Sequence, residues 1–145
     1  MSRKFWITDV RVLIGAFAVL LFANLAAADD AKINAAQKSA EVWTQLIDSG
    51  NYGESWEQAS EPFKKSVAKE RWIDAAKQAR APLGKATSRK LTDSNYATQL
   101  EGAPAGEYVT LQYQTSFEKM STAAEIVHFM LAPDGTWRAV GYVIK

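Results

Sequence analysis

Residues 108–117 have the sequence YVTLQYQTSF, and this stretch decides the fold class. Apolar or bulky side chains occupy every second position from Val109 to Phe117, and hydroxyl or amide side chains occupy most positions between them. An alternation with a period of two is typical of an antiparallel strand that buries one of its faces. We therefore predict a half-buried antiparallel strand over these ten residues.

Three further strands are expected around this one. Residues 125–131 are apolar on both faces, as an inner strand would be. The sequence Pro133-Asp134-Gly135 predicts a hairpin turn that returns the chain along residues 136–144. A fourth strand is expected between residues 85 and 93, and a loop is expected at residues 94–106.

The chain before residue 85 has a helical period instead. A first helix is predicted to begin at a cap on Asp29 or Asp30 and to end at Gly50. Later helices are expected at residues 53–59, 63–67 and 69–80. On the last of them, the side chains expected to face inward are Trp72, Ile73, Ala76 and Ala79.

Helices followed by an antiparallel meander predict an α+β domain. We expect the N-terminal helices to pack on one face of a curved four-stranded antiparallel sheet. That layout is found in the cystatin-like and nuclear-transport-factor-2-like cone folds, which we adopt as the more specific expectation. One domain is the natural count for a chain of 145 residues.

The N-terminus has the organisation of a secretory signal peptide. Three basic residues lie among the first eleven, an uncharged apolar run extends from Val12 to Leu25, and Ala26-Ala27-Ala28 precedes Asp29. The run is shorter than the roughly 20 residues that a membrane-spanning helix needs. We therefore expect cleavage after Ala28 rather than an uncleaved anchor.

This assignment gives a signal peptide at residues 1–28 and a single α+β domain at residues 29–145. The expected location is periplasmic or secreted, with no stable membrane span after cleavage. The basic residues of the leader outnumber its one acid, Asp9, so its removal turns the formal net charge of +1 into −1.

A nearly neutral chain gives no electrostatic case for binding nucleic acid or an anionic membrane. The chain contains no cysteine, which excludes thiol chemistry, cysteine-ligated zinc and iron–sulfur clusters. No metal ligand set and no cofactor is predicted. The expected partner is an unknown small molecule or protein, and a homodimer through the outer sheet face is one arrangement that the pattern allows.

Two arginines are the most informative polar residues. Arg80 shares the inward face of the helix at 69–80 with Ile73 and Ala76, and Arg89 lies beyond the following turn. Two guanidinium groups that converge near a helix end could clamp a carboxylate or a phosphate. A structural ion pair, favoured by the position of Arg80 at a helix C-terminus, explains the same pattern.

Aromatic residues supply the remaining ligand-binding candidates. Outside the leader the chain has four tryptophans, at Trp43, Trp56, Trp72 and Trp137. They could line an aromatic pocket, or they could fill the core between helices and sheet. The candidate ligand-binding set is Arg80, Arg89, Trp72, Trp137 and Tyr113.

No residue is assigned a catalytic role. His128 is the only histidine and has no local partner to orient it, so we expect a packed or edge residue. Glu125 opens a strand on the face of Val127 and Phe129, and it is the acid expected to be partly buried.

The order of several short motifs resembles one bacterial family. They are Leu46-x-Asp48-x-Gly50-x-Tyr52 after Trp43, Ser55-Trp56, Trp72, Arg80-x-Pro82-Leu83-Gly84, Arg89, Gly106-x-Tyr108-Val109, Asp134-Gly135-x-Trp137-Arg138 and Gly141-Tyr142. This ordered set is similar to the domain of unknown function 4019, whose members look like exported proteins of Gram-negative bacteria. The resemblance covers essentially the whole mature chain. It implies a secreted single domain and no established activity.

The sequence thus favours an exported small ligand-binding or protein-interaction domain that is not an enzyme. The alternative is a cone-fold enzyme of the isomerase or hydratase type, acting on a small apolar ligand. Such an enzyme would need a carboxylate or phenol deep in the cone, and the candidates are Tyr108, Tyr113, Glu125 and His128. A third hypothesis is a structural or inhibitory protein that presents the loop at 94–106.

Overall fold

The structure is a computed structural model that describes residues 10–145, with side chains from residue 25 onward. The chain divides into two units, Met1–Ala31 and Lys32–Lys145. The described part of the first unit is helical and belongs to α1 (Val10–Asp48), which continues into the second unit. The basic residues Arg3 and Lys4 of the expected leader lie outside the described residues.

Helix α1 begins well before the predicted cap. Asp29 and Asp30 lie inside the helix, so the prediction that one of them caps it was wrong for the uncleaved chain. The reason is that the segment from Val12 to Ala28 contains no proline and is rich in leucine and alanine, which favour helix. Among the described residues, no helix combines the length and apolar character that crossing a bilayer requires. The cleavage itself stays a prediction.

Three shorter helices follow, close to their predicted positions. They are α2 (Tyr52–Glu57), α3 (Glu61–Ser66) and α4 (Lys69–Arg80). Ser60 caps α3, because its hydroxyl accepts a hydrogen bond from the backbone N–H of Phe63 at 3.3 Å. Ala79 is exposed, so its predicted inward position was wrong, whereas Trp72 and Ala76 are buried as expected.

The predicted antiparallel meander is confirmed. Strands β1 (Ala86–Ala97), β2 (Tyr108–Phe117), β3 (Met120–Leu131) and β4 (Trp137–Ile144) form one sheet in sequence order. The predicted bounds of β2 are correct. β1 and β3 are longer than predicted, because residues 94–97 pair with β2 and residues 120–124 also join the sheet. The loop predicted at 94–106 therefore begins only at residue 98.

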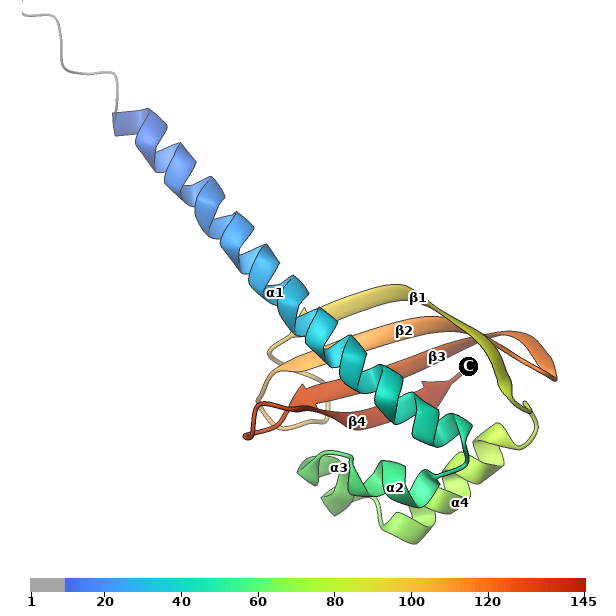
Figure 1. Ribbon diagram of the computed structural model, residues 1–145. Helices are drawn as coiled ribbons and strands as arrows, with labels where there is room; N and C mark the ends of the chain where they lie inside the picture. Colours follow the sequence, from blue (N-terminus) through green and yellow to red (C-terminus); the bar gives the residue numbers. More distant parts are fainter. Residues whose placement is uncertain (1–9) are drawn as a thin grey trace, which may run out of the picture. The chain divides into compact units, whose positions relative to one another are not determined.

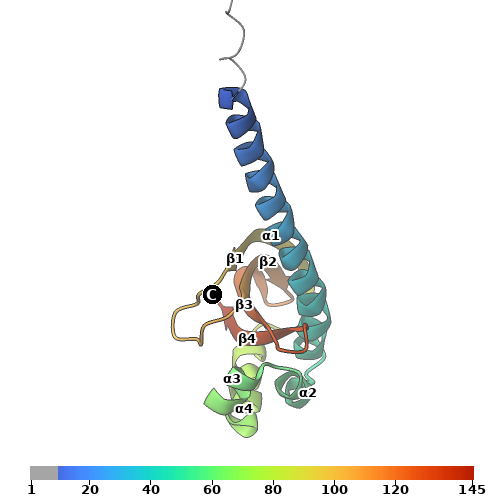
Figure 2. The same ribbon diagram turned by 90° about the vertical axis from the view of Figure 1, so that its left-hand side faces the viewer.

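Within the second unit the helices cover one face of the sheet, which confirms the α+β class. The part of α1 from Lys32 onward runs across the inner face of the strands, and the three short helices lie together beyond β4 (Figure 1). Figure 2 shows the same two layers from the side. Lys32 fastens the start of this unit by donating hydrogen bonds to Tyr96 Oη, at 2.9 Å, and to Glu107.

Aromatic side chains fill the space between the two layers. Trp43 of α1 lies 6.0 Å from Trp72 and 6.1 Å from Phe129, measured between ring centroids. Tyr142 of β4 lies 5.7 Å from Trp43 in the same way. The core of this unit is thus an aromatic layer packed from both sides.

Candidate functional site

A network of buried and half-buried charges joins the helical layer to the sheet, with Arg89 of β1 at its centre. Its Nη1 and Nη2 donate to the two carboxylate oxygens of Asp48, at the end of α1, over 3.0 Å each. Its Nε and Nη2 donate to the two oxygens of Glu125 on β3, over 2.6 and 3.2 Å. One guanidinium thus holds two carboxylates in paired, planar contacts.

Glu125 is completely buried, far beyond the partial burial expected from its place in the sequence. Besides Arg89, its carboxylate accepts hydrogen bonds from Thr115 Oγ1 at 2.8 Å and from Tyr142 Oη at 2.7 Å. Burial and the neighbouring charge of Glu125 raise the pKa of Tyr142 far above its usual value, so its phenol keeps the proton that it donates. The buried carboxylate is therefore hydrogen-bonded on both oxygens.

Arg80 extends the network to α4. Its Nη2 donates to Asp48 at 2.9 Å and its Nη1 to Tyr142 Oη at 3.4 Å, and the guanidinium lies 4.9 Å from the ring centroid of Phe117. Burial alone would raise the pKa of Asp48, but hydrogen bonds and charge from Arg89 and Arg80 hold it below its usual range. Two cations and two carboxylates thus neutralise one another.

The prediction that Arg80 and Arg89 converge is confirmed, and the groups on which they converge are the chain's own carboxylates. Asp48 occupies the position that the carboxylate of a ligand would take between the two guanidinium groups, and Glu125 pairs with Arg89 from the other side. This geometry is that of a structural ion pair. The role of the two arginines in ligand binding stays a prediction.

The other interior candidates lie apart from any open surface. Trp72 is 7% exposed and donates its indole N–H to Ser55 Oγ at 2.9 Å, which fixes it as part of the helical layer. Tyr113 is 5% exposed, and its hydroxyl has no hydrogen-bond partner in the part of the chain that the structure describes. Burial raises the pKa of Tyr113 to about 12, so the phenol is neutral at physiological pH.

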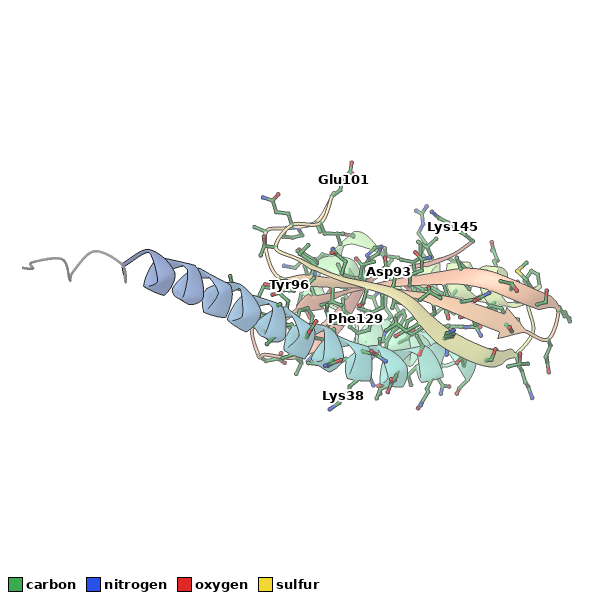
Figure 3. All side chains as sticks on the ribbon, turned by 90° about the horizontal axis from the view of Figure 1, so that it is seen from above. Lys38, Asp93, Tyr96, Glu101, Phe129 and Lys145 are labelled. Atoms are coloured by element: carbon green, nitrogen blue, oxygen red, sulfur yellow. The ribbon has the colours of Figure 1, made fainter. Side chains whose placement is uncertain are left out.

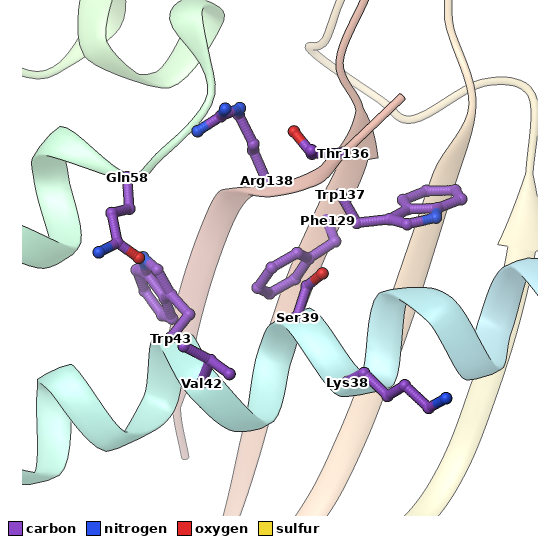
Figure 4. A pocket seen from close by; sticks show the side chains of 9 residues that line it. All are labelled: Lys38, Ser39, Val42, Trp43, Gln58, Phe129, Thr136, Trp137 and Arg138. Atoms are coloured by element: carbon purple, nitrogen blue, oxygen red, sulfur yellow. The ribbon is translucent and has the colours of Figure 1, made fainter. Parts of the chain in front are cut away.

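Trp137, the remaining candidate, lines an open groove of about 380 Å³ between α1 and the turn-proximal ends of β3 and β4 (Figure 4). The apolar side chains of the groove are Val42, Trp43, Phe129 and Trp137. The polar ones are Lys38, Ser39, Gln58, Thr136 and Arg138. Val42 is 58% exposed and leaves apolar surface open to solvent at the edge of the groove.

The β3–β4 turn organises the polar wall of this groove. Asp134 accepts hydrogen bonds from the backbone N–H and the hydroxyl of Thr136, at 3.0 and 2.6 Å, and from Arg138 Nη2 at 3.0 Å. The hydroxyl and N–H of Thr136, together with Arg138, lower the pKa of Asp134 to about 2. Asp134 therefore stays ionised and holds Arg138 beside the groove. On the opposite wall, Lys38 projects from α1 away from the sheet (Figure 3).

His128 lies on the outer face of the sheet with Ile126 and Met130, as its position in the sequence predicted. Its Nδ1 is 2.8 Å from Thr110 Oγ1, and its ring lies where a Cβ on Gly141 would come within 3.0 Å. Burial lowers the pKa of His128. A neutral imidazole packed over a glycine has no carboxylate to orient it for proton transfer.

Sequence reasoning missed two residues that matter here. Asp48 was noted only as a motif residue, although its place one turn after Thr44 on the buried side of α1 was a usable signal. Lys38 carried no signal, because a single exposed lysine on a helix is ordinary. Among the described residues, no group of three or more His, Cys, Asp or Glu side chains could hold a metal ion.

Comparison with known proteins identifies the family. The family model described as "Protein of unknown function (DUF4019)" matches residues 39–142, which include α2, α3, α4, the ion network and the groove except Lys38. No curated protein matches the chain. The chain belongs to the DUF4019 family, as the order of its motifs indicated.

Proposed function

We propose that this protein is an exported, non-enzymatic domain that binds a small ligand in the groove beside Trp137. The observation that carries the proposal is a contrast between the paired charges of the interior and the unpaired charge at the groove. The arginines and carboxylates of the interior are bonded to one another, whereas Lys38 has no ion-pair partner among the described residues.

The shape of the groove supports a binding role. A volume of about 380 Å³ lies in the range of roughly 300–1,000 Å³ that is common for small-molecule sites. Its apolar floor and polar rim also match the usual composition of such sites, in which apolar surface gives affinity and a few polar groups fix orientation. Val42 leaves apolar surface available for contact.

The packing of the interior supports a domain without an active site at the base of a cone. Ring centroids of Trp43, Trp72 and Tyr142 lie 5.7–6.3 Å apart, so aromatic side chains fill the space where a cone-fold enzyme would hold its substrate. All three strand pairs contain a register shift, and irregularities of this kind bend a sheet, which supports the curved sheet that the cone-fold hypothesis needs.

One observation favours the alternative, an isomerase or hydratase. The Tyr113 hydroxyl is buried, neutral and without a partner, and a phenol in that state can donate a hydrogen bond to a developing oxyanion. A substitution of Tyr113 by Phe separates the two proposals. The binding domain keeps its ligand response and its stability in Y113F, because the hydroxyl makes no hydrogen bond to lose, whereas an enzyme would lose turnover.

The export proposal rests on the leader sequence and has a direct test. Expression of the full chain in a Gram-negative host, followed by mass spectrometry of the periplasmic fraction, should give a protein that starts at Asp29. Recovery of the intact chain from the cytoplasm would contradict export.

The binding proposal is tested by recording ¹H–¹⁵N spectra of the exported protein against a library of small metabolites. A ligand of the groove should shift the indole N–H signal of Trp137 and the amide of Val42, and leave the buried indole of Trp72 unchanged. Shifts confined to residues outside the groove would overturn the proposal.

A further inference from the structure

We infer that the groove selects a small monoanion with a flat apolar body, such as a ring that carries a short carboxylate chain. This inference rests on the proposed function and names the chemical class of its ligand.

The charge of the groove sets the charge of the ligand. Its lining contains two cations, Lys38 and Arg138, and no carboxylate. Asp134 lies outside the lining and neutralises Arg138 through a contact of 3.0 Å. One positive charge, on Lys38, remains without a partner among the described residues. A single negative charge is therefore the complement that the groove lacks.

The two cations lie on opposite walls. Lys38 belongs to α1 and Arg138 to β4, and the aromatic floor lies between them (Figure 4). A carboxylate at either wall keeps its solvation on the open side, so it does not bear the desolvation cost of a buried charge. The head group is thus held at the rim while the rest of the ligand lies on the floor.

The floor favours a flat body. Phe129 and Trp137 belong to neighbouring strands and close the bottom of the groove with rings that are 1% and 8% exposed, and the exposed side chain of Val42 adds apolar surface from α1. A flat ring can cover this shallow apolar surface and meet the exposed edge of Trp137, whereas a flexible aliphatic chain loses more conformational freedom when it is held there. The groove volume of about 380 Å³ accommodates a single ring with a short side chain.

Asp134 competes with an anionic ligand for Arg138, which provides a further test of the inference. It positions Arg138, and it also occupies one of the guanidinium nitrogens with its own negative charge. An Asn at this position keeps an oxygen that can accept from Thr136 and removes the charge. Arg138 then becomes available to an anion.

The experiment uses the exported protein and two probes that share a body and differ in charge, 3-phenylpropionate and 3-phenylpropionamide. Binding is followed through the Trp137 indole N–H and Val42 amide signals. The carboxylate should bind at least fivefold more tightly than the amide, and added salt should narrow this ratio. Butanoate, an anion without a ring, should bind more weakly than 3-phenylpropionate.

Variants on the two walls should move affinity in opposite directions. K38Q should weaken the carboxylate about fivefold and leave the amide unchanged, since an exposed charge contact contributes about 1 kcal/mol. D134N should tighten the carboxylate. K77Q removes an exposed lysine of α4 outside the groove and serves as the matched control, with no change for either probe.

The outcomes separate the inference from the proposed function. Equal binding of the carboxylate and the amide in the groove would overturn the selectivity for a monoanion and leave the groove as a binding site. Weakening of the carboxylate by D134N would also overturn it. Absence of any shift at Trp137 and Val42, for these probes and for the metabolite library, would overturn both.

Discussion

The domain uses an arginine–carboxylate pair in two places, with opposite surroundings. Arg89 and Glu125 meet inside the domain, where the Glu125 side chain is 0% exposed. Arg138 and Asp134 meet beside the groove, where the Asp134 side chain is 54% exposed. The contact distances, 2.6 and 3.0 Å, are similar.

Burial decides what each pair does. A buried pair has given up its hydration, so the loss of one partner leaves an uncompensated charge in a medium of low dielectric. An exposed pair keeps its hydration, and each partner can exchange the other for an external ion at little cost. The interior pair therefore joins β1 to β3 inside the sheet and contributes to stability, and the surface pair remains available for recognition.

The strongest test of the interior pair is the E125Q substitution. Gln keeps the shape of the side chain but leaves Arg89 without one of its two counter-charges, and it places an amide N–H₂ where two donors already point. We expect a loss of about 3–5 kcal/mol in the free energy of unfolding, measured by urea denaturation. E101Q removes an exposed acid from the loop before β2 and should change stability by less than about 0.5 kcal/mol.

A loss below about 1 kcal/mol in E125Q would show that the buried network does not hold the domain together. The contrast between the two arginine pairs would then have no energetic basis.

Substitution of Arg89 by Lys keeps the charge and removes the planar fork. A lysine ammonium cannot make paired contacts with Asp48 and Glu125 at once. We expect R89K to lose about 2 kcal/mol of unfolding free energy in urea titrations, because at least one charged hydrogen bond disappears. Wild-type stability in R89K would mean that charge alone, without the geometry of the fork, stabilises the network.

The order of helices and strands was predicted well from the sequence, because the signals for most of these elements lie within short stretches of the chain. The alternation from Val109 to Phe117 sets a strand in any context, and Pro133-Asp134-Gly135 sets a turn through its own hydrogen bonds and through the φ of +82° at Gly135. The predicted end of β1 was wrong because residues 94–97 show no clear alternation of apolar and polar side chains. Their strand conformation comes from pairing with β2.

The charge network could be predicted only in part. Two arginines near a helix end indicated a cluster, and burial of Glu125 followed from its place on an apolar strand face. The sequence could not show that Asp48 and Glu125 both pair with Arg89, because these residues lie 36 to 41 positions from Arg89 along the chain. The groove was missed for the same reason, since α1 and the β3–β4 turn meet only in the folded domain.

Acid should weaken the interior network through Asp48. The pKa of Asp48 is held below its ordinary value of 3.8 in the folded state, so its ionised form contributes stability above pH 4 that is lost as the pH falls through the folded pKa. We expect the urea midpoint to fall as the pH drops below about 4. D48N should be less stable at pH 7 and have a flatter pH dependence, whereas D74N, an exposed substitution on α4, should follow the wild type.

If the urea midpoint of D48N fell with pH as steeply as that of the wild type, Asp48 would not be the source of the acid sensitivity. The acid sensitivity would then belong to other carboxylates, and Asp48 would contribute no linkage between protonation and folding.

The smallest effect on stability is expected at the groove, and it completes the comparison. Val42 is exposed on α1, so V42Q should change the free energy of unfolding by less than about 0.5 kcal/mol. The same substitution places a polar amide over the aromatic floor and should weaken binding of 3-phenylpropionate, followed at the Trp137 indole signal, by about threefold. Interior substitutions would then change stability, and this one would change recognition alone. A V42Q variant that unfolds as readily as E125Q would show that the groove is part of the packed core, and that the two regions do not differ in the way their burial indicates.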